Sequence, residues 1–138
     1  MSRLFIDTNV PLYAAGGEHP LREPCQRLIR AIAAGELEAM TDVEVFQELL
    51  HRYFHIGQRQ TGLLLFDHFH RIMLGHVLPI DDAILLRARE LADEHPSLSP
   101  RDLVHLAVME RYQLQEIITA DKGFENLAGI RRVSPEEF

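Results

Sequence analysis

Four acidic residues spread along the chain are its main candidates for chemistry: Asp7, Glu48, Asp102 and Asp121. Asp7 follows the apolar run Leu-Phe-Ile and Asp121 follows Ile-Ile-Thr-Ala, so each carboxylate is expected where a buried strand ends. Ligands of open parallel sheets gather beyond the carboxyl ends of the strands, which predicts that Asp7 and Asp121 face one crevice. Converging carboxylate oxygens are hard ligands that favour Mg²⁺ or Mn²⁺ over zinc.

The first two acids also have simple structural explanations. Asp7 or Asn9 could accept backbone N–H groups in an Asx-type turn, which the local pattern favours as much as a functional role. Glu48 is spaced i, i+4 from both Glu44 and Arg52, which in isolation favours a solvated ladder worth ~0.3–0.5 kcal/mol per favourable pair. Against the ladder, Glu48 lies at the edge of the apolar helix face, where an acid can point into a cleft.

The other two acids have structural explanations of their own. Asp102 comes three residues after Ser99 and could serve only as the acidic partner in a capping box. Asp121 could belong to a turn in which Gly123 takes a positive φ. His105 lies one turn after Asp102 and could reach the same face, but a lone histidine there is more often a surface or core residue than a ligand.

The elements that must position these acids alternate along the chain. Apolar or β-branched runs predict strands at residues 3–6, 37–40, 76–80, 116–119 and 130–133. Apolar residues at helical spacing predict helices between residues 25 and 35, 41 and 53, 57 and 75, 81 and 95, and 99 and 112, with a loop at 8–20. The alternation predicts one α/β domain with a mostly parallel sheet of four to five strands and helices on both faces.

Polar residues mark where several of these helices begin. Thr41 and Glu44 have the spacing of a capping box, and Asp81 is placed as an N-cap. Ser99 is followed by proline at the first helical position, which makes an unusually clear helix start. Gly62 weakens the start of the third predicted helix and leaves its boundaries open.

The composition is that of an ordinary soluble protein with one domain over residues 1–138. The 14 basic and 21 acidic residues give a net charge of −7, which argues against nonspecific binding to nucleic acid. A cation site nevertheless requires carboxylates, and bound metal would reverse the local sign. Cys25 is the only cysteine, and no apolar run approaches the ~20 residues that span a bilayer. A cytoplasmic location is expected.

Two other kinds of site receive less support. His51 and His55 have an i, i+4 spacing that suits zinc, but no third ligand is apparent and the HExxH pattern is absent. His68 and His70 belong to a different predicted helix. An aspartyl-phosphate phosphatase could place its nucleophile at Asp7, but such enzymes usually need a second Asp two residues later, where this chain has Asn.

Four segments together resemble the acidic motifs of PIN-domain proteins. They are Phe-Ile-Asp-Thr-Asn-Val from residue 5, the helix that carries Glu48, Ser-Pro-Arg-Asp-Leu-Val-His-Leu-Ala from residue 99, and Ile-Thr-Ala-Asp-Lys-Gly-Phe from residue 118. The resemblance implies a Rossmann-like parallel sheet and cleavage of RNA that depends on one or two Mg²⁺ or Mn²⁺ ions. It assigns the catalytic, metal-binding acids to Asp7, Glu48, Asp102 and Asp121, with Asn9 and Thr119 as supporting polar residues.

The same resemblance implies partners. Small stand-alone PIN proteins resemble the VapC-type toxins of toxin–antitoxin pairs, which are usually homodimers neutralised by a small antitoxin. Glu44 is an alternative acid to Glu48, and Glu125 is a reserve ligand because Gly123 stands where many relatives have another acid. Candidate contacts to RNA are Arg101, Lys122 and Arg22. A PIN-like module that binds RNA or protein without cutting is the main alternative.

Overall fold

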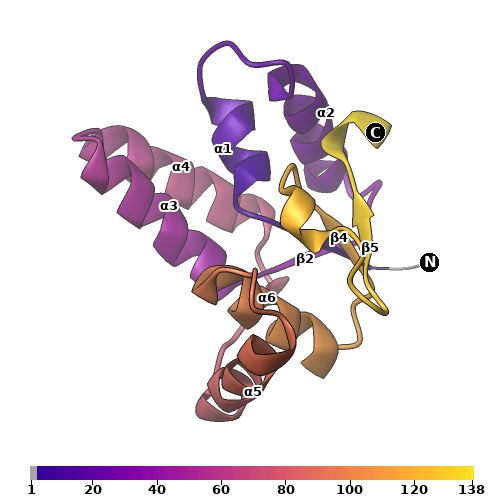
Figure 1. Cartoon of the computed structure of the whole chain (residues 1–138). Helices are drawn as coiled ribbons and strands as arrows, with labels where there is room; N and C mark the ends of the chain where they lie inside the picture. The colour runs from indigo at the N-terminus through magenta and orange to yellow at the C-terminus, as the bar shows by residue number, and fades with distance from the viewer. Residues whose placement is uncertain (1–2) are drawn as a thin grey trace.

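Five short strands form one sheet in the computed structural model, which describes residues 3–138 (Figure 1). The strands are β1 (Leu4–Ile6), β2 (Ala39–Asp42), β3 (Val77–Leu78), β4 (Glu116–Ile118) and β5 (Arg131–Val133). Their order is β3-β2-β1-β4-β5, so the first strand occupies the centre. Phe5 pairs with Met40 on one side and with Ile117 on the other. The expected sheet of four to five strands is confirmed, and every pairing is parallel.

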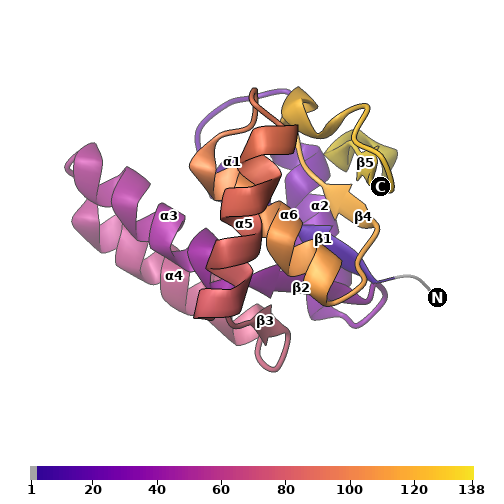
Figure 2. The same ribbon diagram turned by 60° about the horizontal axis from the view of Figure 1, so that its bottom comes forward.

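Six α-helices within the described residues surround this sheet. They are α1 (Asn9–Ala15), α2 (Arg22–Ala33), α3 (Val43–His55), α4 (Arg59–Ile72), α5 (Asp82–Glu94) and α6 (Pro100–Arg111). Helices α1 and α2 lie on one side of the sheet and α5 and α6 on the other, while α3 and α4 form a hairpin that projects from the body (Figure 1, Figure 2). Two 3₁₀ turns follow β4 and β5, namely η1 (Lys122–Phe124) and η2 (Pro135–Glu137).

The helices bury the central strands on both faces. Phe5 and Ile6 of β1 are fully buried, and so are Ile117 and Ile118 of β4. A strand that is covered on both faces has no solvent-facing positions for polar residues. This explains why the strands read in the sequence as continuous apolar runs rather than alternating patterns.

Helix α1 corrects one expectation from the sequence, because residues 8–20 do not form a single loop. Seven of them form a helix of about two turns, Asn9–Ala15. Pro11 falls in the first turn of this helix, where no backbone N–H is needed. The side chain of Val10 is fully buried. A helix this short contains too few apolar positions to display a helical period.

Helix α3 begins with a different cap from the one predicted. The N-cap is Asp42, not Thr41, because the Asp42 Oδ1 accepts a hydrogen bond from the Val45 N–H at 3.1 Å. Thr41 belongs to β2, which starts two residues later than predicted, and its hydroxyl donates to the Ile6 carbonyl at 3.0 Å. Pairing with β3 therefore overrides the capping preference of Thr41.

The two other predicted N-caps, Asp81 and Ser99, are confirmed. The Asp81 Oδ1 accepts from the Ile84 N–H at 2.9 Å at the start of α5. The Ser99 hydroxyl accepts from the Asp102 N–H at 3.2 Å at the start of α6, where Pro100 is the first helical residue. The second of these caps fixes the backbone of Asp102, one of the four candidate acids.

Helices α3 and α4 pack closely along the hairpin. A Cβ atom on Gly62 would lie 2.5 Å from the Tyr53 Cβ, a distance that no side chain tolerates. Farther along, the Phe46 ring lies against the rings of Phe66 and Phe69, with centroids 5.1 and 5.4 Å apart. Gly62 therefore lies inside α4 because the packing of the hairpin requires it.

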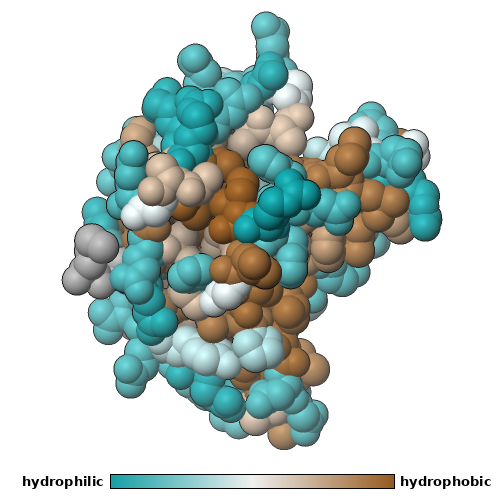
Figure 3. All heavy atoms as spheres, turned by 180° about the vertical axis from the view of Figure 1, so that it is seen from behind, coloured by the Kyte–Doolittle hydropathy of each residue, from teal (hydrophilic) through white to brown (hydrophobic). Residues whose placement is uncertain are grey.

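Apolar side chains are also exposed on the outer helices. Figure 3 shows apolar surface that continues from the body of the molecule onto the projecting hairpin. On the hairpin, Phe54, Ile56 and Leu64 are at least 39% exposed, and on α5 Leu85 and Leu86 are at least 50% exposed. No helix within residues 3–138 combines the length and the apolar character needed to cross a membrane.

Candidate active site

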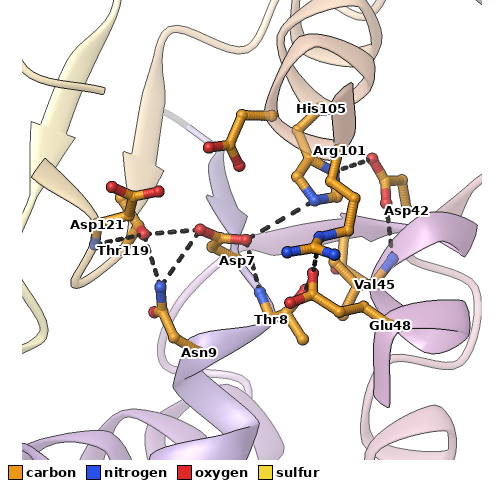
Figure 4. Close-up of polar contacts among 12 residues, drawn as sticks. Asp7, Thr8, Asn9, Asp42, Val45, Glu48, Arg101, His105, Thr119 and Asp121 are labelled. Carbon is orange, nitrogen blue, oxygen red and sulfur yellow. Dashed lines mark hydrogen bonds and ion pairs between the residues drawn. The ribbon is translucent and has the colours of Figure 1, made fainter. Parts of the chain in front are cut away.

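Three neighbouring strands bring polar side chains to one edge of the sheet. Asp7 directly follows β1, Asp42 ends β2, and Thr119 directly follows β4. Because β1 lies between β2 and β4, Asp7 has polar neighbours from both sides. Figure 4 shows Asp7 at the centre of this group, with Glu48 on one side and Asp121 on the other. The functional groups thus meet beyond the carboxyl ends of the strands, as the parallel topology predicts.

The Asp7 carboxylate is enclosed and held by several donors. Asp7 is only 5% exposed. Its Oδ1 accepts from the Thr8 N–H at 2.7 Å, and its Oδ2 accepts from the Thr119 hydroxyl at 2.7 Å and from the Asn9 side-chain amide at 3.4 Å. Burial raises the pKa of Asp7, although the charge of His105 and the hydrogen bonds oppose this. A cation bound beside Asp7 would therefore stabilise its charged form.

Asn9 and Thr119 join the loop after β4 to the start of α1. The Thr119 hydroxyl, which donates to Asp7, accepts from the Asn9 amide and from the Asp121 N–H, both at 2.9 Å. The Asn9 Oδ1 accepts from the Ala120 N–H at 3.1 Å. Both residues therefore lie where the sequence placed supporting polar groups, and they hold the segment that carries Asp121.

Asp102 and Asp121 face each other across the site. Burial, the charges of Asp7 and Asp121, and a hydrogen bond with Asp121 raise the pKa of Asp102 to about 7. The Asp121 Oδ1 also accepts from the Gly123 N–H at 2.8 Å. The expected positive φ at Gly123 is wrong, since Gly129 and Asn126 are the nearby residues with positive φ. The two acids therefore crowd together, and the charge of His105 only partly offsets their repulsion.

Glu48 reaches the same site from α3. It is 6% exposed, and its Oε1 accepts from the Thr8 hydroxyl at 3.0 Å. The Arg101 Nε lies 3.0 Å from Oε1, and the Arg52 Nε lies 3.6 Å from Oε2. The i, i+4 ion pair with Arg52 exists, but the solvated ladder is wrong because Glu48 is buried and points inward. Glu44 does not line the site.

One pocket of about 450 Å³ collects these groups. Its lining includes all four acids singled out in the sequence: Asp7, Glu48, Asp102 and Asp121. Arg101 also lines it, whereas the other two proposed RNA contacts, Lys122 and Arg22, do not. Glu125 lies outside the pocket and pairs with Arg132 at 2.8 Å. The four acids are thus brought together from distant parts of the chain.

A buried pair, Asp42 and His105, adjoins the site: the sequence prediction included His105 only as a residue that could reach the face of Asp102, and it missed Asp42. The His105 Nδ1 lies 2.7 Å from the Asp42 Oδ2, and its Nε2 lies 3.7 Å from the Asp7 Oδ1. Burial alone would lower the pKa of His105, but the charge and hydrogen bond of Asp42, with the charges of Asp7 and Asp102, raise it to about 9. Asp42 could have been found from the sequence, because it lies at the end of a strand as Asp7 does.

The donor set fits a hydrated Mg²⁺ or Mn²⁺ ion better than zinc. Within residues 3–138, no group of three or more His, Cys, Asp or Glu side chains is placed to hold a metal ion. Mg²⁺ usually keeps several waters and binds through one or two carboxylates, which an open acidic pocket provides. His51 and His55 stack on each other at a centroid distance of 6.1 Å outside the pocket, so the zinc alternative gains no support.

Comparisons with known proteins agree with this fold. The PIN domain model matches residues 4–130. A VapC ribonuclease of Mycobacterium bovis is 34% identical over 131 residues, which cover 95% of this chain and 99% of that protein. In a VapBC2 structure from Rickettsia felis bound to promoter DNA, the similar chain has a TM-score of 0.74 at 14% identity, with 96% of this chain and 98% of that chain covered. A toxin–antitoxin complex from Klebsiella pneumoniae contains a chain with a TM-score of 0.64 at 21% identity, over 97% of this chain and 98% of that one. With its parallel sheet and its acidic pocket, this chain belongs to the PIN-domain family.

Proposed function

We propose that this protein is an endoribonuclease that uses Mg²⁺ or Mn²⁺ to hydrolyse phosphodiester bonds in RNA. The observation that carries the proposal is the meeting of Asp7, Glu48, Asp102 and Asp121 in one pocket at the carboxyl edge of the sheet. The name of the similar M. bovis protein, a VapC ribonuclease, supports the same activity.

The residues of the pocket would divide the work between them. The principal ligands of the cation would be Asp7, Asp102 and Asp121. Glu48 would act from the side of the pocket that α3 forms. Thr119 and Asn9 hold Asp7 and the backbone of the Asp121 segment in fixed positions before any ion binds. Preorganised ligands of this kind spare the reorganisation that flexible groups would need.

A divalent cation held by these acids would supply Lewis acidity, which would make a bound water more acidic and would offset the charge that develops on the phosphate. The chain itself then needs no nucleophilic side chain. The raised pKa of Asp102 means that this residue would release its proton when the ion binds, because its negative charge is then compensated. We expect products with 5′-phosphate and 3′-hydroxyl ends.

We further propose that the protein is the toxin of a toxin–antitoxin pair, working as a homodimer in the cytoplasm. The similar chain from K. pneumoniae belongs to a toxin–antitoxin complex, which supports a small antitoxin as partner. The exposed apolar side chains of the hairpin and α5 offer surface for contact with other chains. The alternative, a module that binds RNA or protein without cutting, predicts the same fold but no cleavage.

Cleavage of labelled single-stranded RNA in the presence of Mn²⁺ tests the proposal. We expect Asp7→Asn, Asp102→Asn and Asp121→Asn each to lower kcat/KM by a factor on the order of 100 or more, because each loses a ligand charge. Asp93→Asn is the matched control, since the Asp93 side chain is 75% exposed on α5 and, within residues 3–138, pairs with Arg89 alone. A wild-type protein that binds diverse RNAs but cuts none would establish the binding module instead.

A further inference from the structure

Two arginines from different helices converge on one buried carboxylate at the wall of the pocket. Arg101 of α6 and Arg52 of α3 both approach Glu48 through Nε, at 3.0 and 3.6 Å. The Glu48 side chain is 8% exposed, whereas those of Arg101 and Arg52 are 45% and 55% exposed. Figure 4 shows the Arg101 side chain extending from α6 onto Glu48, beside Asp7.

The charge of this cluster is not balanced. A buried carboxylate needs a partner, but one guanidinium would suffice to neutralise Glu48. The second leaves a net positive charge on this wall, and the other charged residues that line the pocket are acids. Half-exposed arginines in a simple ion pair would contribute little, because water screens their charge. Neutralising Glu48 therefore explains only part of the arrangement.

Each guanidinium also has donors to spare. Arginine carries five N–H donors in a planar fork that matches the oxygens of a phosphate group. Within residues 3–138, neither the Arg52 side chain nor the Arg101 side chain has a hydrogen bond or ion pair other than the one with Glu48. The terminal nitrogens of both side chains thus remain available to a ligand at the pocket.

We propose that Arg52 and Arg101 form a phosphate clamp, which binds the RNA backbone next to the bond that is cut, and that Glu48 is the positioning residue that holds the clamp. This inference rests on the proposed ribonuclease function. It places the phosphate site and the acids Asp7, Asp102 and Asp121 in one pocket. It also explains how a chain with a net charge of −7 binds a polyanion, because the attraction is local.

The binding test measures the fluorescence anisotropy of a labelled single-stranded ten-nucleotide RNA in EDTA, over a series of KCl concentrations. We expect Arg52→Gln and Arg101→Gln each to weaken binding about 3- to 10-fold and to reduce the slope of log K against log [KCl] by about 0.7, the loss of one phosphate contact. Arg101→Lys should keep the slope but bind more weakly, because it retains the charge and loses the fork.

Arg89→Gln is the matched control, because Arg89 is 70% exposed on α5 and pairs with Asp93 away from the pocket. It should leave both affinity and slope unchanged.

Glu48→Gln tests the positioning role in cleavage assays and by calorimetry with Mn²⁺. If Glu48 is a positioning residue, Glu48→Gln should raise KM by a larger factor than it lowers kcat. It should also lose less Mn²⁺ affinity than Asp102→Asn does.

The outcomes separate this inference from the proposed activity. If wild type cleaves RNA while both glutamine variants bind with the wild-type slope, the clamp is wrong and the ribonuclease stands. If wild type does not cleave but binds RNA with a slope that depends on both arginines, the clamp stands and the activity is wrong. If wild type neither cleaves nor binds RNA, both are wrong. A Glu48→Gln variant that loses as much Mn²⁺ affinity as Asp102→Asn, with KM unchanged, overturns the positioning role.

Discussion

Asp102 ionises less readily in the folded protein than in the unfolded chain. Burial and the nearby charges of Asp7 and Asp121 raise its pKa from 3.8 to about 7. A raised carboxyl pKa means that the folded protein holds a proton that the unfolded chain releases. Folding stability therefore falls as the pH rises from about 4 to about 7, and the full loss remains above that range.

This linkage predicts that Asp102→Asn stabilises the protein when no divalent cation is present. Asn has nearly the same shape and cannot ionise, so it avoids the cost of a charged carboxylate beside Asp121. In EDTA at pH 8 we expect the variant to melt about 5 °C higher than wild type, with the difference vanishing near pH 4. Melting curves followed by circular dichroism at several pH values measure this. A difference that is the same at pH 4 and pH 8 would contradict the account.

At the level of single residues, the sequence predicts the acids of the pocket better than their surroundings. Asp7 and Asp121 could be predicted because each follows an apolar run, and strand ends meet in a parallel sheet. His105 and Asp42 could not be paired from the sequence, because their contact spans 63 residues and depends on how α6 docks beside β2. The contact between Arg101 and Glu48 could not be predicted for the same reason, since Arg101 comes from a different helix, whereas the i, i+4 spacing does predict the Arg52 pair.

At the scale of the elements, the close packing of α3 against α4 depends on one glycine, Gly62. Gly62 brings the backbone of α4 against the Tyr53 side chain of α3. Helix α3 also carries Glu48, so the position of the hairpin affects the wall of the pocket. Backbone contacts this close cannot be relieved by a change of rotamer at Gly62, because the added atom is a Cβ.

We predict that Gly62→Ala destabilises the protein by about 1–3 kcal/mol, although alanine is the better helix former by about 1 kcal/mol. The expected loss arises because the new methyl group would lie 2.5 Å from the Tyr53 Cβ. Urea denaturation measures the free energy of unfolding. Thr61→Ala, an exposed change in the same helix turn, is the control and should be neutral or slightly stabilising. Equal stability of the two variants would show that the hairpin adjusts without cost.

Most elements could be predicted because their patterns are long or well capped. Helices α5 and α6 begin at Asp81 and Ser99 as expected, since both caps act locally. Helix α1 could not be predicted, because two turns of helix that are stabilised by burial of Val10 leave no periodic pattern. The start of α3 was misplaced because pairing of Thr41 in the sheet is a long-range effect that a local capping rule does not include.

For the molecule as a whole, the net charge of −7 and the crowded acids of the pocket favour the binding of cations. Repulsion between Asp7, Asp102 and Asp121 opposes folding, and it is relieved when a cation binds the native pocket but not the unfolded chain. The same pocket that would perform catalysis is therefore a source of instability in the absence of metal.

We predict that Mn²⁺ at 100 times its dissociation constant raises the free energy of unfolding by about 2.7 kcal/mol, which corresponds to a melting temperature on the order of 10 °C higher. EDTA should abolish the rise, and Asp121→Asn should reduce it because a ligand charge is lost. Differential scanning calorimetry of wild type and variant provides the measurement. A wild-type melting temperature that does not respond to millimolar Mn²⁺ would count against cation binding at this pocket.

The central place of β1 has a consequence for the synthesis of the chain. The ribosome makes β1 early, but the strand needs β4 beside it, and the hydrogen bond from Thr119 to Asp7 spans 112 residues. Asp121 is made later still. A growing chain that has not reached these residues cannot close the pocket, however well its first helices fold. The ribonuclease activity proposed above therefore cannot begin in a nascent chain before residues 119–121 have been made and have joined β1.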